Sequence, residues 1–151
     1  MEMPARCSEH RVDETETILG RAARECGAIA ATLHERSGDI LILRQQVGIP
    51  QKTLDMIRSI PKGKGMAGQA WVTGKAVSTC NLKSDPNQVI QPGARSVKGL
   101  TATAIPVHTD SGQLSHVVGF SFADQRQTDG EPGRLLERLA VSVAIAASEL
   151  S

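Results

Sequence analysis

Aromatic side chains are almost missing from this sequence of 151 residues, which contains Trp71, Phe120 and Phe122 but no tyrosine. Binding sites for flat rings such as purines, flavins or tetrapyrroles normally use aromatic faces as stacking surfaces. The shortage therefore argues against ligands of these kinds. Because so few rings must serve a whole interior, we expect Trp71 and the two phenylalanines to lie mainly in the core.

Charge of one sign and long apolar runs are also lacking. Seventeen basic and sixteen acidic side chains leave a formal net charge of +1, so no strong field would attract a phosphate backbone or an anionic membrane. No run approaches the roughly 18 apolar residues that a membrane helix needs, and charged residues stand where a secretory signal would have its apolar segment. We expect a cytoplasmic protein that binds neither nucleic acid nor membrane.

Cysteine is scarce as well. Cys7, Cys26 and Cys80 are odd in number and widely spaced, which favours free thiols over disulfides. A structural zinc site needs closely spaced ligand pairs, and the sequence has none. His108 and His116 flank a predicted hairpin turn, but without a nearby cysteine or carboxylate they make a poor metal site. We therefore predict no metal site, and we expect both histidines at the surface or at the hairpin end.

The length predicts a single domain whose core needs no disulfides. After a flexible lead-in at 1–12, apolar residues at helical spacing predict an amphipathic helix at 13–26, which begins with a capping box of Asp13 and Glu16. A second apolar stripe predicts a long helix at 131–150. Apolar and β-branched segments predict strands at 29–33, 40–43, 76–80, 99–107 and 114–122, with a short helix at 53–57 that closes one side of a cavity.

A run of glycines stands near the middle of the chain. Gly63, Gly65 and Gly68 predict a tight entry into a helix at 66–72, which stops at Gly74. Glycine suits these positions because the backbone must turn sharply and approach a neighbour closely, which a Cβ would obstruct. The same spacing occurs in nucleotide-binding loops, but the buried strand, long helix and ribose-binding acid that such a loop needs are not convincing here.

The polar segment at 81–98 separates this run from the next strand. At about eighteen residues it is long for a connection inside a compact domain, which favours a lid or binding loop over a passive link. It contains Gln88, Arg95 and Ser96. Solvated loop residues are the alternative interpretation, but if Arg95 faces a pocket, its planar guanidinium favours a carboxylate or phosphate ligand.

Together these segments resemble the GAF domain, a small sensory module. The shared pattern is the Gly-x-Gly-x-x-Gly run, then Thr-Gly-Lys-x-Val at 73–77, a loop, and a strand ending in Ile-Pro-Val at 105–107. The resemblance spans nearly the whole chain. It implies an α+β fold with a central antiparallel sheet of strand order 2-1-5-4-3, the terminal helices on one face, and a ligand cavity with a covering loop on the other.

The resemblance also implies a function: a non-catalytic, small-molecule-binding sensory or regulatory domain in signal transduction. A ligand would favour one arrangement of the covering loop, and the change would reach the terminal helices. The implied ligand-binding residues are Trp71, Cys80, Asn81, Gln88, Arg95, Ser96 and Thr103. The sequence identifies neither the ligand nor any cofactor.

Two kinds of protein partner are expected. No kinase, cyclase or helix-turn-helix signature accompanies the domain, so the chain is either a fragment or a stand-alone sensor that acts through a signalling protein. GAF modules are known as dimers built from terminal helices, which implies a homodimer. Val141 and Ile145 project from the polar side of the last helix, and we predict them at the dimer contact.

Two alternatives to a sensor stay open. One branch of the family resembles free methionine-(R)-sulfoxide reductase, which needs a nucleophilic and a resolving thiol. Here Ala67 stands where that branch commonly has a cysteine, and Cys80 is the only thiol expected near the pocket. The other alternative is a ligand-free dimerisation module, in which Ala102, Ala104 and Ala123 fill the cavity. A cyclic-nucleotide branch is disfavoured because its Asn-Lys-x-Phe-Asp-Glu motif is missing.

Overall fold

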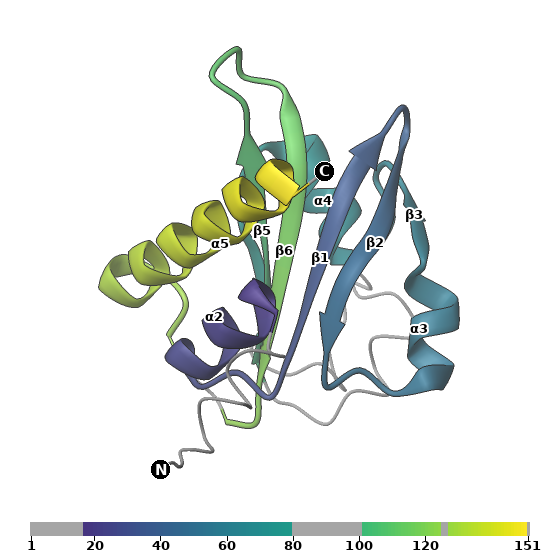
Figure 1. Cartoon of the computed structure of the whole chain (residues 1–151). Helices are drawn as coiled ribbons and strands as arrows, with labels where there is room; N and C mark the ends of the chain where they lie inside the picture. The colour runs from purple at the N-terminus through teal and green to yellow at the C-terminus, as the bar shows by residue number, and fades with distance from the viewer. Residues whose placement is uncertain (1–16, 80–100, 125–126, 151) are drawn as a thin grey trace, which may run out of the picture.

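The computed structural model describes residues 17–79, 101–124 and 127–150 (Figure 1). The elements in chain order are α2 (Ile18–Cys26), β1 (Ala30–Ser37), β2 (Ile40–Val47), α3 (Gln51–Ile57), β3 (Ser59–Pro61), α4 (Gly65–Thr73), β4 (Val77–Thr79), β5 (Thr101–His108), β6 (Leu114–Phe122) and α5 (Gly130–Leu150). None of the helices among these residues is both long and apolar enough to cross a membrane.

The strands form one antiparallel sheet of six, in the order β3-β2-β1-β6-β5-β4. The predicted order 2-1-5-4-3 is therefore wrong as stated, because it lacks the edge strand Ser59–Pro61. That strand is three residues long and ends in proline, so it is too short to show an alternating pattern. The α+β class and the antiparallel sheet are as predicted, and the other five strands have the expected neighbours.

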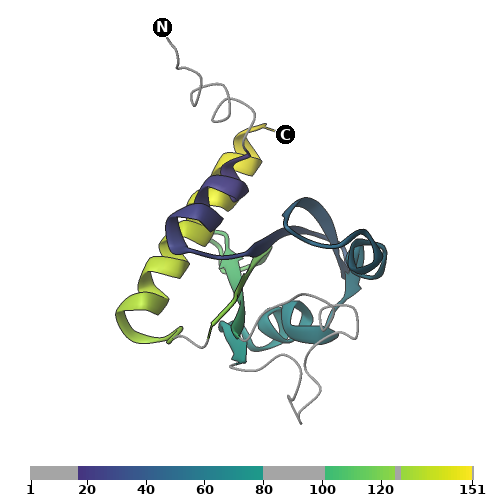
Figure 2. The same ribbon diagram turned by 90° about the horizontal axis from the view of Figure 1, so that it is seen from below.

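The two terminal helices cover one face of the sheet, and Figures 1 and 2 show α2 and α5 lying side by side there. Their apolar sides meet inward-facing residues of the central strands to form the main core. Its buried members include Leu19, Ala23, Leu33, Val118, Phe120, Phe122, Leu136, Ala140 and Val143. The two phenylalanines lie in this core, as predicted. Burying such side chains stabilises the fold by about 1.5–3 kcal/mol each.

The other face of the sheet meets α3 and α4. A second, smaller apolar cluster lies there, with Leu41, Ile57, Ile60, Ala70 and Val117 among its buried members. The two clusters occupy opposite faces because successive side chains on a strand point to opposite sides. The sheet therefore separates a helix-packed core from a second interior.

The first described helix begins at Ile18 and not at residue 13. Thr17 has an extended backbone (φ −74°, ψ 163°), and its side chain accepts a hydrogen bond from the Gly20 amide, which makes it the N-cap. The predicted capping box of Asp13 and Glu16 lies outside the described residues. Gly27 ends the helix in the left-handed conformation at φ 78°, which glycine adopts without strain.

The glycine run forms the predicted tight entry into a helix, which begins at Gly65. Gly63 and Gly65 have positive φ values of 87° and 64°, and Gly74 ends α4 with its amide bonded to the Ala70 carbonyl. Gly68 lies directly against the backbone of Gly63. The run therefore places α4 close to the loop that leaves β3.

Replacing Gly68 by alanine should destabilise the protein. The new Cβ would lie 2.8 Å from the carbonyl carbon of Gly63 and 3.0 Å from the Pro61 oxygen, and both are backbone atoms that resist displacement. We expect Gly68→Ala to lower the free energy of unfolding by about 1–3 kcal/mol, measured by urea denaturation. This loss would occur although alanine has the better helix propensity.

The matched control is Val72→Ala, on the exposed side of the same helix. It should change the free energy of unfolding by about 0.5 kcal/mol or less. If Gly68→Ala is as stable as the native chain, the close approach of α4 to this loop is not needed for the fold.

Candidate functional site

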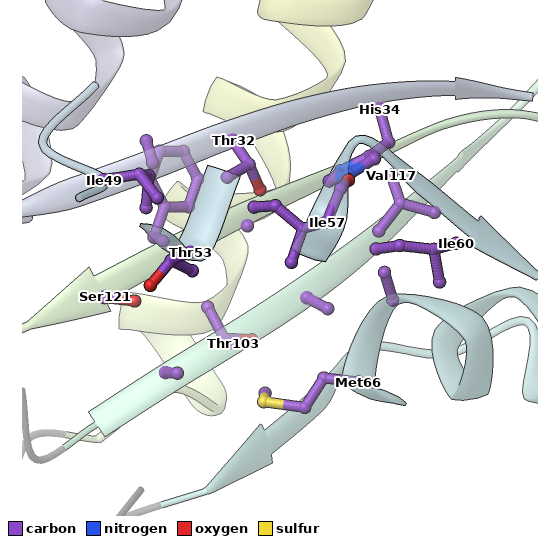
Figure 3. Close-up of a pocket in the computed structure, with 16 residues that line it drawn as sticks. Thr32, His34, Ile49, Thr53, Ile57, Ile60, Met66, Thr103, Val117 and Ser121 are labelled. Atoms are coloured by element: carbon purple, nitrogen blue, oxygen red, sulfur yellow. The ribbon is translucent and has the colours of Figure 1, made fainter. Parts of the chain in front are cut away.

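A hollow of about 100 Å³ lies between the second face of the sheet and the α3–α4 layer. Figure 3 shows the side chains around it, contributed by β1, β5 and β6 on one side and by α3, β3 and α4 on the other. The lining consists of Ala31, Thr32, His34, Ile49, Thr53, Ile57, Ile60, Met66, Ala67, Ala102, Thr103, Ala104, Val117, Gly119, Phe120 and Ser121.

Pairing between β1 and β6 builds the floor of the hollow. Thr32 lies opposite Gly119, and His34 lies opposite Val117. A Cβ on Gly119 would lie 2.8 Å from the Thr32 hydroxyl oxygen, so glycine gives that hydroxyl its place on the sheet surface. On the next strand, Ala104 pairs with Gly119. Small residues at successive floor positions leave room above the sheet.

The opposite wall comes from the short elements after β2. Thr53 and Ile57 are buried on α3, and Ile60 is buried on β3. Met66 and Ala67, on the first turn of α4, complete the wall. The helix predicted at 53–57 thus does border the hollow. The position of α4 depends on Gly68, which lets this helix lie against the loop after β3.

His34 ties the floor to the wall. Its side chain is 2% exposed, and Nε2 lies 2.9 Å from the Ile57 carbonyl oxygen. A carbonyl oxygen can only accept, so Nε2 must carry the hydrogen. Burial lowers the pKa of His34, and the bond to the Ile57 carbonyl partly opposes this shift. The ring is therefore a neutral donor at neutral pH, because charging it would require desolvating the imidazolium.

The hollow is mostly apolar. Its polar side chains are Thr32, His34, Thr53, Thr103 and Ser121, and no Asp, Glu, Lys or Arg lines it within the described residues. Ala102 and Ala104 line the space and leave it open. The third residue suggested as a filler, Ala123, is exposed beyond the end of β6.

The predicted ligand-binding residues fall into three groups. Thr103 lines the hollow, and its Oγ1 accepts a hydrogen bond of 2.9 Å from Ser78 Oγ. Trp71 does not line it: the ring is half-buried against the second cluster, with Arg36 and Lys62 5.7 and 5.4 Å from its centre. Cys80, Asn81, Gln88, Arg95 and Ser96 lie outside the described residues, as does the predicted covering loop at 81–98.

Sequence reasoning did not single out Thr32, His34 or Ser121. Thr32 and His34 are the two neighbours of Leu33 on β1. If this leucine packs under the terminal helices, both neighbours face the opposite side of the sheet. The alternation was visible, but the residue types were ordinary for a strand. Only the position of α3 over the sheet turns them into cavity residues.

One expectation about the histidines is wrong. His108 is exposed, but His116 is 5% exposed, between Glu35 of β1 and Val107 of β5. Its Nδ1 lies 3.0 Å from Ser115 Oγ. Burial lowers the pKa of His116, and the charge of Glu35 opposes that shift. Because β6 pairs with a strand on each side, His116 lies within the sheet.

Among residues 17–79, 101–124 and 127–150, no three His, Cys, Asp or Glu side chains come together as a metal site would require. A second, open groove of about 910 Å³ runs between the later turns of α5 and the β5–β6 hairpin. Val141 and Ile145 lie along it and are 43% and 53% exposed.

The fold is shared with several solved structures of low sequence identity. The GAF domain/HD domain protein of Geobacter sulfurreducens is 14% identical with a TM-score of 0.66, over 91% of this chain and 92% of that one. The GAF domain of an Acinetobacter phosphoenolpyruvate-protein phosphotransferase is 11% identical with a TM-score of 0.66, over 94% and 90%. Free methionine-R-sulfoxide reductase of Neisseria meningitidis is 21% identical with a TM-score of 0.56, over 91% and 86%.

These identities are low enough that the likeness concerns the fold alone. No functionally curated protein matches the sequence significantly. The sequence profile of the GAF domain, however, matches residues 9–147, which covers every described helix and strand apart from the last residues of α5. The chain therefore belongs to the GAF domain family.

Proposed function

We propose that this chain is a non-catalytic sensory domain that binds a small molecule in the hollow between the sheet and the α3–α4 layer. The observation that carries the proposal is the hollow itself: small residues, Gly119 and Ala104, keep it open above the floor, and His34 fixes its wall. Membership of a family of sensory modules supports the same conclusion. Ligand pockets are typically concave and mostly apolar, with a few placed polar groups.

The route from ligand to output would run through the central strands. Thr32 and His34 line the hollow, whereas Leu33, between them on the same strand, packs in the core beneath the terminal helices. A ligand that binds one arrangement of the wall better would shift the population toward that arrangement. The same shift would alter the packing of α2 and α5. We also propose that the segment at 81–98 covers the hollow.

A reductase is the competing proposal, since four of the structures with this fold, from three organisms, are free methionine-R-sulfoxide reductases. Such chemistry needs two thiols that can exchange. Ala67, which stands where that branch commonly has a cysteine, lines the hollow. The thiol of Cys26 lies on α2, partly buried against the core on the opposite face of the sheet. These positions favour a domain without this enzymatic activity.

We propose a cytoplasmic location, because the three cysteines are odd in number and widely spaced, as is typical of proteins from reducing compartments. A signalling protein would receive the output. The balanced charge of the chain supports neither nucleic acid nor an anionic membrane as a partner.

Filling the hollow should abolish ligand binding. We predict that a panel of small metabolites contains compounds that raise the melting temperature of the native chain, because a ligand that binds only the folded state stabilises it. The rise should vanish in Ala67→Leu, whose larger side chain enters the hollow from α4. The matched control is Val72→Leu, on the exposed side of the same helix, and it should keep the full response.

Two outcomes would contradict the proposed function. One is a response that survives unchanged in Ala67→Leu, which would place the ligand elsewhere. The other is turnover of free methionine sulfoxide with a thiol reductant that is lost in Cys80→Ser, which would make the chain a reductase.

We further propose that the chain forms a homodimer through α5. Val141 and Ile145 are among its large exposed apolar residues, one helical turn apart, and residues four apart share one side of a helix. They border the groove beside the β5–β6 hairpin. Pairing two copies of this surface would remove apolar area from water.

Charging this surface should dissociate the dimer. We predict that Val141→Glu/Ile145→Glu sediments as a monomer at concentrations at which the native chain sediments as a dimer. The control is Met56→Glu, which charges an equally exposed apolar residue on α3 (50% exposed) and should leave the dimer intact. A native chain that is monomeric at high micromolar concentration would refute the proposal.

A further inference from the structure

The lining of the hollow restricts the charge of whatever it holds. Every lining side chain in the described part of the chain is apolar or formally neutral at neutral pH. His34, the one titratable residue there, has its pKa lowered by burial. A carboxylate or ammonium placed against this surface would lose its hydration without gaining a countercharge, which costs several kcal/mol.

The volume of the hollow restricts the size of the ligand. An apolar cavity of about 150 Å³ can take up benzene, a molecule of six non-hydrogen atoms. The hollow here measures about 100 Å³. By proportion it suits a compound of about four or five non-hydrogen atoms. Nucleotides, tetrapyrroles and long-chain lipids are too large for the space as it stands.

The polar groups that line the hollow restrict the hydrogen bonds that a ligand can form there. The Thr103 hydroxyl is already engaged by Ser78, and the His34 donor by the Ile57 carbonyl. Thr32 and Ser121 line the floor from adjacent strands, and Figure 3 shows Ser121 beside Thr53, with Thr32 between that end of the hollow and Ile57. They are the hydroxyls best placed to reach a ligand. At the opposite end the wall is aliphatic, with Ile57, Ile60 and Val117.

We infer that the hollow takes a neutral, mainly aliphatic molecule of about four or five non-hydrogen atoms with one hydrogen-bonding group, such as a short-chain alcohol, aldehyde or ketone. The hydroxyl or carbonyl end meets Thr32 and Ser121, and the alkyl end packs on Ile57, Ile60 and Val117. This inference rests on the proposed sensory function. It differs from the carboxylate or phosphate that Arg95 would favour, and the two can be separated by experiment.

The test compares three probes of nearly the same shape, butan-1-ol, butanoate and butylammonium, at equal ionic strength and pH 7. Each is titrated into the full-length, ¹⁵N-labelled chain, and the amide shifts of Thr32, Val117 and Gly119 are followed by NMR. We expect a saturable shift with butan-1-ol, at an affinity at least tenfold above that of either ion. Ala67→Leu should abolish it, and Val72→Leu should retain it.

Should Ala67→Leu fail to give a folded spectrum, Ala102→Val fills the hollow from β5 instead. A carboxylate or ammonium probe that saturates these same amides as tightly as butan-1-ol overturns the inference while leaving the sensory proposal intact. No saturable shift with any of the three probes also overturns it. The sensory proposal falls separately, if the metabolite panel yields no compound whose effect depends on Ala67.

Discussion

The pairing of β1 with β6 determines which residues face the core under the terminal helices and which face the hollow on the other side of the sheet. In one register, Leu33 lies beside Val118 under the terminal helices, while Thr32 lies beside Gly119 and His34 beside Val117 on the opposite face. A slip of one residue would send the leucine into the hollow and the threonine into the core. The apolar residues that hold α2 and α5 therefore also fix which polar groups face the hollow. Structure and proposed function depend on this single register.

The hollow stays open because the sheet on one side and α3 and α4 on the other are held in place and cannot move together to fill it. Protein interiors pack densely, and flexible walls would collapse into unfilled space. Here the floor is a sheet, and the wall is held at two points. His34 anchors the end of α3 through the Ile57 carbonyl, and Gly68 lets α4 press against the loop after β3. Between these anchors, Gly119 and Ala104 provide too little side chain to fill the space.

Much of this architecture could be predicted from sequence, for reasons that can be named. The glycine run predicted α4 and its end at Gly74, because positive φ angles and close backbone contacts leave few alternatives to glycine. The shortage of aromatic residues predicted that Phe120 and Phe122 lie in the core, where the structure places them. Strand β3 was not predicted, because a segment of three residues that ends in Pro61 is too short to show the alternation of apolar and polar residues that marks a strand.

The candidate site was harder to predict, because it is made by tertiary placement. His34 carries no motif, and its importance comes from an α3 carbonyl far away in sequence that only the folded chain brings near. His116 was expected at the surface or at the hairpin end. The hairpin turn is visible in the sequence, but the burial of the strands beside it is not. Trp71, the most conspicuous residue near the glycine run, lies outside the hollow beneath Arg36 and Lys62. Small residues such as Ala104 and Gly119 indicated the position of the hollow better than Trp71 did, because cavities form where side chains are short.

The proposed function depends on an open, apolar space between the sheet and the α3–α4 layer, and xenon binding tests for this space most directly. Xenon enters apolar cavities of this kind without needing a hydrogen bond or a charge. A crystal of the full-length protein under xenon pressure should show a xenon atom among Ile57, Ile60 and Val117. Electron density in which the chain's own side chains fill that space, with no xenon bound there, would contradict the account.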